Sequence, residues 1–189
     1  MRDRDVRMAL HRRVLREHHK HPNTLVLNEL GLCHGACRVD IAVVNGRLHG
    51  YEIKSDSDTL ERLDHQIKNY SSVLDRAWLV VGEKHLSKAM DRLPDWWGVK
   101  SVSQGPRDGI SFENYRKAAD NPKQDPVAIA QLLWHVEAAN ILRTKGASEA
   151  ELRRPRAILY GLLAEAFDLQ SLRDLVRQQL KERANWRDQ

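Results

Sequence analysis

The sequence predicts an α/β fold, in which a mixed β-sheet is flanked by helices and followed by an all-helical C-terminal lobe. Three extended runs rich in Val, Ile and Leu lie within residues 24–55. A helical pattern and a short apolar strand come next, and a strand, a helix and a strand form a crossover unit. After residue 126 no convincing strand remains. We therefore expect a core over residues 1–117, a linker over 118–126 and a helical lobe over 127–189.

Composition indicates the kind of partner. The chain of 189 residues can bury a core without disulfides, and its net charge of +5 and pI near 9.4 favour a polyanion such as DNA. No apolar run reaches the roughly 18 residues that span a bilayer, and the arginine-rich N-terminus lacks the apolar stretch of a signal peptide. We expect a cytoplasmic protein with no membrane partner.

The two cysteines give one alternative site. Cys33 and Cys37 are too few for a disulfide scaffold, and they are half the ligands of a usual structural zinc or iron-sulfur site. Together with His49 they could help to bind zinc, but an ordinary loop and strand edge is the preferred interpretation.

The first twenty residues predict a basic helix. Val6, Leu10 and Val14 recur every four positions, and most arginines lie away from them. This arginine face is either simply solvated or contacts phosphate, and the sequence leaves both interpretations open. Pro22 ends the helix.

Strands are predicted over residues 24–32, 38–44 and 47–55, and the loop between the last two decides the register. A two-residue turn at Asn45 and Gly46 would send Asp40 and Glu52 to opposite faces, because side chains alternate along a strand. A three-residue loop that includes Arg47 pairs Val44 with Leu48 and sets Asp40 across from Glu52. We predict the three-residue loop. It also collects an apolar set on the opposite face: Val39, Ile41, Val43, Tyr51 and Ile53.

The remaining elements follow from capping and hydrophobic patterns. Asp58 is the predicted N-cap of a helix that extends to about Arg76. Further predicted elements are a central strand at 77–81, a helix at 83–92, a strand at 96–102, a turn at 105–109 before residues 110–112, and helices at 127–143, 155–167 and 171–186. The helical lobe is where we expect a homodimer contact or a protein partner.

The acidic residues suit phosphodiester hydrolysis, which needs a hard cation and a positioned water. Asp40, Glu52, the backbone carbonyl of Ile53 and the nearby Glu29 form a plausible partial cage for Mg²⁺ or Mn²⁺. Lys54 emerges on the same face as Glu52. Its ammonium can hydrogen-bond the water, offset the carboxylate charge or assist proton removal.

These residues resemble the PD-(D/E)XK nuclease superfamily. Glu29, Asp40 and the triplet from Glu52 to Lys54 stand on successive strands followed by a helix, as in its restriction-endonuclease-like fold. Gln66 and Tyr70, one helical turn apart, resemble the motif that follows the catalytic lysine in RecB-like exonuclease domains. The resemblance covers roughly residues 24–82 and is close to uncharacterised bacterial and phage members.

The resemblance implies a mixed sheet of four or five strands and Mg²⁺- or Mn²⁺-dependent cleavage of DNA. Asp40, Glu52, Lys54, Glu29, Gln66 and Tyr70 would be the active-site residues. Two departures stand out: Val39 replaces the usual proline before Asp40, and the cysteines of iron-sulfur-bearing relatives are absent. We therefore expect no iron-sulfur cluster.

Three alternatives stay open at this point. Asp40, Glu52 and Lys54 could form a surface ion-pair ladder across the hairpin. The chain could instead be a non-catalytic nucleic-acid-binding or regulatory protein on a nuclease-like scaffold. It could also be a toxin or phage-defence component whose helical lobe recruits a protein.

Overall fold

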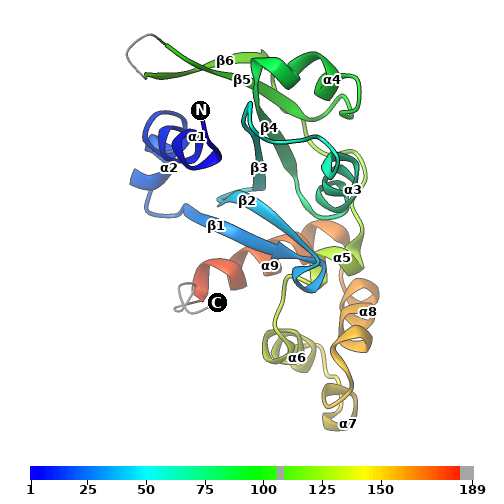
Figure 1. Cartoon of the computed structure of the whole chain (residues 1–189). Helices are drawn as coiled ribbons and strands as arrows, with labels where there is room; N and C mark the ends of the chain where they lie inside the picture. Colours follow the sequence, from blue (N-terminus) through cyan, green and yellow to red (C-terminus); the bar gives the residue numbers. More distant parts are fainter. Residues whose placement is uncertain (106–108, 184–189) are drawn as a thin grey trace.

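The computed structural model describes residues 1–105 and 109–183, and its centre is one mixed sheet with the strands in sequential order (Figure 1). The parallel pairs are β3–β4 and β4–β5, and the other three pairs are antiparallel. The six strands are β1 (Leu25–Leu32), β2 (Cys37–Val44), β3 (Leu48–Lys54), β4 (Arg76–Gly82), β5 (Gly98–Gln104) and β6 (Ile110–Arg116).

The predicted α/β class and helical C-terminal lobe agree with this architecture. The sheet has one strand more than the resemblance implies, because β6 is a full partner of β5. Within the described residues the helical segments are α1 (Asp3–Ala9), η1 (Leu10–Val14), α2 (Arg16–Lys20), η2 (Cys33–Gly35), α3 (Leu63–Val73), η3 (Glu83–His85), α4 (Leu86–Met90), α5 (Pro126–Ala130), α6 (His135–Thr144), α7 (Glu149–Leu152), α8 (Arg156–Ala166) and α9 (Leu169–Glu182).

Helices cover both faces of the sheet. On one face, Val6, Leu10 and Leu15 of the N-terminal helical segment join a buried cluster with residues of β2, β3, β4, β5 and β6. The predicted apolar stripe of this segment is thus its buried side, although a π-helical turn at η1 interrupts the α-helix. On the other face, α3 and the helical lobe share a second, larger cluster with the sheet.

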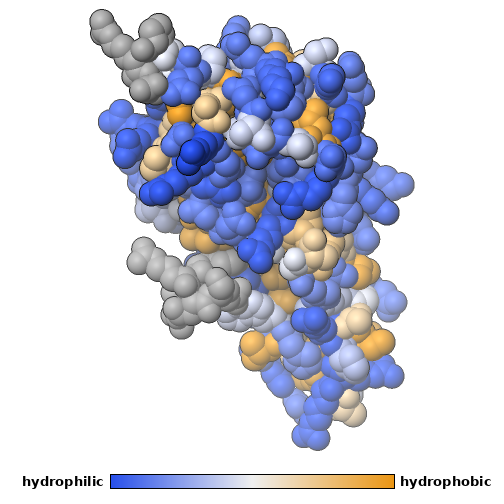
Figure 2. Space-filling model, viewed as in Figure 1, coloured by the Kyte–Doolittle hydropathy of each residue, from blue (hydrophilic) through white to orange (hydrophobic). Residues whose placement is uncertain are grey.

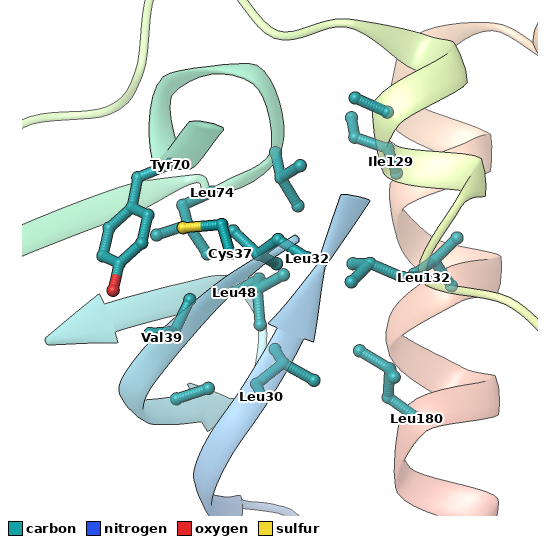
Figure 3. Packing of buried hydrophobic residues seen from close by; sticks show 14 of the residues in the cluster. Leu30, Leu32, Cys37, Val39, Leu48, Tyr70, Leu74, Ile129, Leu132 and Leu180 are labelled. Atoms are coloured by element: carbon teal, nitrogen blue, oxygen red, sulfur yellow. The ribbon is translucent and has the colours of Figure 1, made fainter. Parts of the chain in front are cut away.

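The helical lobe packs directly on the sheet. Figure 3 shows Leu30 and Leu32 of β1 facing Ile129 of α5, Leu132 just after it and Leu180 of α9. The segment before α5 is also tied down, since Asn121 Nδ2 donates to the carbonyls of Ser71 and Leu74, each at 2.8 Å. The lobe and the sheet therefore share one continuous apolar core.

Two helix predictions need correction. Helix α3 begins at Leu63 and not after Asp58, because the Asp58 carboxylate instead accepts hydrogen bonds from the backbone and hydroxyl of Ser55. The predicted helix at 127–143 is two helices. The first ends at Ala130, and the second begins at His135 after the N-cap Trp134, whose backbone N donates to Glu137 Oε2 at 2.8 Å.

Residues 106–108 of the predicted turn at 105–109, and the end of the predicted helix at 171–186 beyond residue 183, lie outside the described residues. Figure 2 shows that the viewed face is mostly hydrophilic, with apolar residues scattered over the helical lobe. Among the described residues of this lobe, four large apolar side chains are exposed: Val127, Trp134, Val136 and Ile158. In the part of the chain that is described, no helix has the length and apolar character to cross a bilayer.

Candidate functional site

The loop between β2 and β3 has the predicted three residues. Val44 pairs with Leu48, and the antiparallel ladder continues as far as Ile41 and Tyr51, where it ends. This register is the one that places Asp40 and Glu52 at the same end of the hairpin, so the predicted loop is confirmed.

Asp40 lies where β2 and β3 stop pairing. Its Oδ2 accepts a hydrogen bond from the backbone N of Ile53 at 2.7 Å, just beyond the last ladder pair between β2 and β3. On the other side of β2, Asn28 pairs with Ile41 and Leu30 with Val39, while Glu29 between them has a φ of 58°. A non-glycine residue in the left-handed region is uncommon and signals a local distortion that redirects side chains.

Because of this distortion, the face of the sheet predicted for Val39 is wrong. Val39 packs in the cluster beneath α3 and the helical lobe, whereas Ile41, Val43, Tyr51 and Ile53 pack beneath the N-terminal helices as predicted. The alternation along β2 changes sides at Asp40, opposite the left-handed Glu29. Strict alternation assumes a regular strand, so it fails where the strand is distorted.

Glu52 is enclosed by three donors. It is 1% exposed, and its Oε1 accepts from Lys54 Nζ at 2.7 Å and from Gln66 Nε2 at 2.5 Å. Its Oε2 accepts from the Tyr70 hydroxyl, which also donates to the carbonyl of Arg38 at 2.9 Å. Helix α3 supplies both Gln66 and Tyr70 because residues four apart share a helix face. The structure thus brings all these predicted residues together. Glu52 and Lys54 are buried, and Glu52 also binds two side chains of α3, so the group is not an exposed hairpin ladder.

Arg7 is a site residue that the sequence did not reveal. Its Nη1 donates to the Asp40 carbonyl at 2.6 Å, and its Nη2 lies 3.0 Å from Asp40 Oδ1 and 3.1 Å from Glu29 Oε1. The only sequence signal is its place next to Val6 on the buried side of α1. Arg7 is therefore the counter-ion of Glu29 and Asp40, the two acids at the distorted part of the sheet.

Burial and charge act together on the acids. The pKa of Asp40 is raised to about 7, first by burial and then by the negative charge of Glu52, against the lowering effect of the Ile53 N–H and Arg7. The pKa of Tyr70 is raised well above its usual value, again by burial first and then by Glu52. A buried carboxyl group whose pKa is raised further by a neighbouring carboxylate marks a place where an added positive charge would be stabilised.

Around these groups lies a polar cavity of about 500 Å³, which we call the acidic cavity. The buried Oε1 of Gln66 has no hydrogen-bond partner within the part of the chain that the structure describes, so it is an acceptor that a ligand or water in the cavity could satisfy. The side chains that line the cavity include those of Asp3, Arg7, Glu29, Arg38, Asp40, Glu52, Lys54, Asp58, Arg62, His65 and Gln66.

Any cation here would need ligands beyond side chains. Among residues 1–105 and 109–183, no three His, Cys, Asp or Glu side chains are grouped closely enough to hold a metal by themselves. Asp40 and Glu52 would have to be joined by backbone oxygens and waters, which is the coordination that Mg²⁺ commonly keeps. The zinc alternative is not supported, since Cys37 packs in the cluster on one side of the sheet and the His49 ring lies near His18 of α2.

The imidazole of His49 is expected to make the fold less stable at acidic pH. Burial first, and then the positive charge of Arg76, lower the pKa of its imidazole from 6.5 to about 4. Because the folded pKa is the lower one, the neutral ring stabilises the fold above about pH 6.5, and this contribution is lost as the pH falls through about 4. Between pH 7 and pH 4 the free energy of unfolding should decrease in both the wild type and His49→Gln. The decrease should be larger in the wild type than in His49→Gln, by up to about 3 kcal/mol. Urea unfolding at both pH values measures it. The exposed His21→Gln is the control, and an equal loss in wild type and His49→Gln would contradict the expectation.

Comparison with known proteins places the chain in a family. A family model described as "Bacteriophage P4 protein cII" matches residues 1–189. The curated "Protein cII" of Enterobacteria phage P4 is 28% identical over 159 residues, which are 84% of this chain and 59% of that protein. The chain thus spans less than two thirds of the length of this relative. No solved structure matches. From the match over residues 1–189, the chain belongs to the bacteriophage P4 protein cII family.

Proposed function

We propose that this protein is a metal-dependent nuclease that hydrolyses phosphodiester bonds of DNA on a restriction-endonuclease-like fold. The observation that carries the proposal is the convergence of Asp40, Glu52 and Lys54 at the point where β2 and β3 separate, beside Gln66 and Tyr70 of α3. The basic composition supports a polyanionic substrate.

The residues present fit Mg²⁺ or Mn²⁺. Asp40 and Glu52 both line the acidic cavity. The pKa of Asp40 is raised first by burial and then by the negative charge of Glu52, and a divalent cation would offset that charge. The unpartnered Gln66 Oε1 can accept a hydrogen bond from a water in the same cavity. Asp40, Glu52 and the Ile53 carbonyl would hold the cation, and Glu29 would reach it through a water or by leaving Arg7.

Each residue then has a distinct role. When bound, the cation would supply charge neutralisation at the scissile phosphate and acidify a water. Lys54, whose ammonium lies against Glu52 Oε1, would donate a hydrogen bond to that water. Tyr70 fixes the orientation of Glu52 by donating to its other oxygen, and Gln66 donates to the first oxygen, so its carbonyl oxygen would be left to accept from the water.

One observation favours a second candidate, a non-catalytic nucleic-acid-binding or regulatory protein on the same scaffold. Arg7 and Lys54 offset the charge of Asp40 and Glu52, and Gln66 and Tyr70 satisfy the oxygens of Glu52 by hydrogen bonds, so protein groups alone accommodate the acids. In such a protein the acidic residues would stabilise the sheet opening, and basic surfaces would bind the nucleic acid.

A cleavage assay separates the two functions. Purified protein is incubated with linear duplex, nicked duplex or single-stranded DNA in Mg²⁺, in Mn²⁺ or in EDTA. We expect product with either metal and none in EDTA. DNA binding that persists in EDTA, without product under any metal, would reject the nuclease and support the binding protein.

Arg7 provides a test that does not depend on cleavage. In Arg7→Ala the metal-free protein should lose about 1.5 to 3 kcal/mol of stability, the usual value of hydrogen bonds to a charged group. Added Mn²⁺ should then raise the melting temperature of this variant more than that of the wild type, because Asp40 Oδ1 and Glu29 Oε1 no longer face a competing cation. Arg4→Ala, on the exposed side of α1, is the control. Equal Mn²⁺ shifts in wild type and Arg7→Ala would contradict a cation at these oxygens.

A further inference from the structure

A second cavity lies between the β1–β2 turn and the helical lobe. It encloses about 400 Å³, and its walls include His34 and Gly35 of the turn, and Trp134, Arg156 and Tyr160 of the lobe. Gly35 also lines the acidic cavity, so this one turn borders both spaces. We call the second cavity, defined by these five residues, the stacking pocket.

The aromatic side chains of the stacking pocket are held in place. Trp134 is 39% exposed, and the Arg183 guanidinium lies 4.3 Å from its ring centroid while Arg183 Nε donates to Glu137 Oε1 at 2.7 Å. Tyr160 stacks with His34 at 5.6 Å between centroids, and its hydroxyl donates to the Leu133 carbonyl at 2.8 Å. Rigid aromatic surfaces can stack with a planar ligand at a small entropic cost.

Arg156 supplies the charge. The other arginines of the lobe that face the sheet or the core pair with carboxylates, as Arg173 and Arg177 do with Asp75, and Arg183 with Glu137. Arg156 is exposed at the start of α8, and its charge lies near enough to His34 to help lower the pKa of that imidazole, after burial. An exposed guanidinium beside aromatic rings suits a phosphate attached to a stacked base.

The turn that joins the two cavities has an unusual backbone. Cys33, His34 and Gly35 have φ values of 48°, 58° and 85° in succession. Two adjacent non-glycine residues in the left-handed region are strained, and such strain persists where the surroundings impose it. This conformation keeps the His34 ring against Tyr160 and Gly35 between the two cavities.

We propose that the stacking pocket binds an unpaired nucleobase of single-stranded DNA, with Arg156 at the neighbouring phosphate. The proposal rests on the proposed nuclease function, because the strand would pass the Gly35 turn to reach Asp40. Base stacking on aromatic rings is tolerant of sequence, whereas a base inside a duplex must first be unstacked and unpaired. The preferred substrate is therefore single-stranded DNA or a duplex with a single-stranded end.

Binding in EDTA tests the pocket apart from catalysis. Fluorescence anisotropy of a short labelled oligothymidylate and of a blunt duplex is measured with the full chain at one fixed salt concentration. Trp134→Ala should weaken single-strand binding about 5- to 150-fold, the range expected for one stacked base. Trp134→Phe should restore most of the affinity. Arg156→Ala should weaken binding and reduce its salt dependence.

Matched controls are on the same elements. Val136→Ala removes an exposed apolar side chain from α6, and Arg153→Ala removes an exposed charge close to α8, and neither residue lines the pocket. Both variants should bind like the wild type, and circular dichroism should confirm that every variant is folded.

The outcomes separate the pocket from the nuclease. Single-strand binding that depends on Trp134, in a protein that cleaves nothing, would keep the pocket and reject the nuclease. Cleavage with unchanged single-strand binding in Trp134→Ala and Arg156→Ala would keep the nuclease and overturn the pocket. Equal losses for single strand and duplex would also overturn it.

Discussion

Replacing Lys54 with methionine is expected to lower the metal-dependent cleavage rate by about 100-fold or more, while DNA binding in EDTA stays close to that of the wild type. Methionine keeps most of the apolar stem of the buried lysine and removes the ammonium that lies 2.7 Å from Glu52 Oε1. Positioned proton-transfer groups contribute about 10² to 10⁴ in rate, so the loss should appear in the rate of the chemical step. Single-turnover cleavage of labelled DNA with saturating Mn²⁺ measures it.

The matched control is Lys68→Met, which removes an exposed ammonium from α3. It should cleave at the wild-type rate. Asp40→Asn should resemble Lys54→Met in cleavage, and in addition should show weaker Mn²⁺ binding. Full activity in Lys54→Met, with the fold intact, would reject the proposed assignment of the active site.

Replacing Asp75 with alanine is expected to cost about 3 to 5 kcal/mol of stability, the largest loss that we predict for a polar residue. The side chain of Asp75 is 6% exposed, and its Oδ2 accepts from the backbone N of Leu48 at 2.6 Å and from Arg177 Nη1 at 2.8 Å. Its Oδ1 lies 3.3 Å from both Gln124 Nε2 and Arg173 Nη1. Removing one member of a buried ion pair leaves the other charge uncompensated, which is costly.

Asp120→Ala is the control, since Asp120 is an exposed acid that also contacts two arginines, Arg47 at 2.8 Å and Arg76 at 2.7 Å. Exposed pairs contribute no more than about 1 kcal/mol. Asp75→Asn, which retains an oxygen for the Leu48 N–H, should fall between the two. Urea unfolding measures all three, and equal losses in Asp75→Ala and Asp120→Ala would show that Asp75 does not hold the helical lobe to the sheet.

Predictions from local chemistry agree best with the structure. The three-residue loop at 45–47 follows from turn geometry, and it sets the register of β2 and β3. The pair Gln66 and Tyr70 follows from helical spacing alone, and both side chains reach Glu52. In each case the interacting residues are near in sequence or share one regular element.

Predictions that assumed regularity fail where another contact, local or tertiary, competes with the regular pattern. Val39 changes sides because Glu29 adopts a left-handed conformation across from Asp40, an event in another strand that a strand pattern does not show. Asp58 caps no helix because its carboxylate is bonded to Ser55. The helix predicted at 127–143 breaks where the Leu133 carbonyl accepts from Tyr160, which comes from a later helix.

The sequence by itself determined the α/β class, the hairpin register and the acids, lysine and glutamine that meet at its open end, because periodicity and turn chemistry are local. Only the tertiary structure decided that Arg7, which lies 33 residues before Asp40 in the sequence, is the counter-ion of that acid. It also decided that the helical lobe shares its core with the sheet and forms a pocket beside Gly35. Such contacts join distant segments through packing, and the pattern of one segment carries no record of which distant side chain will lie against it.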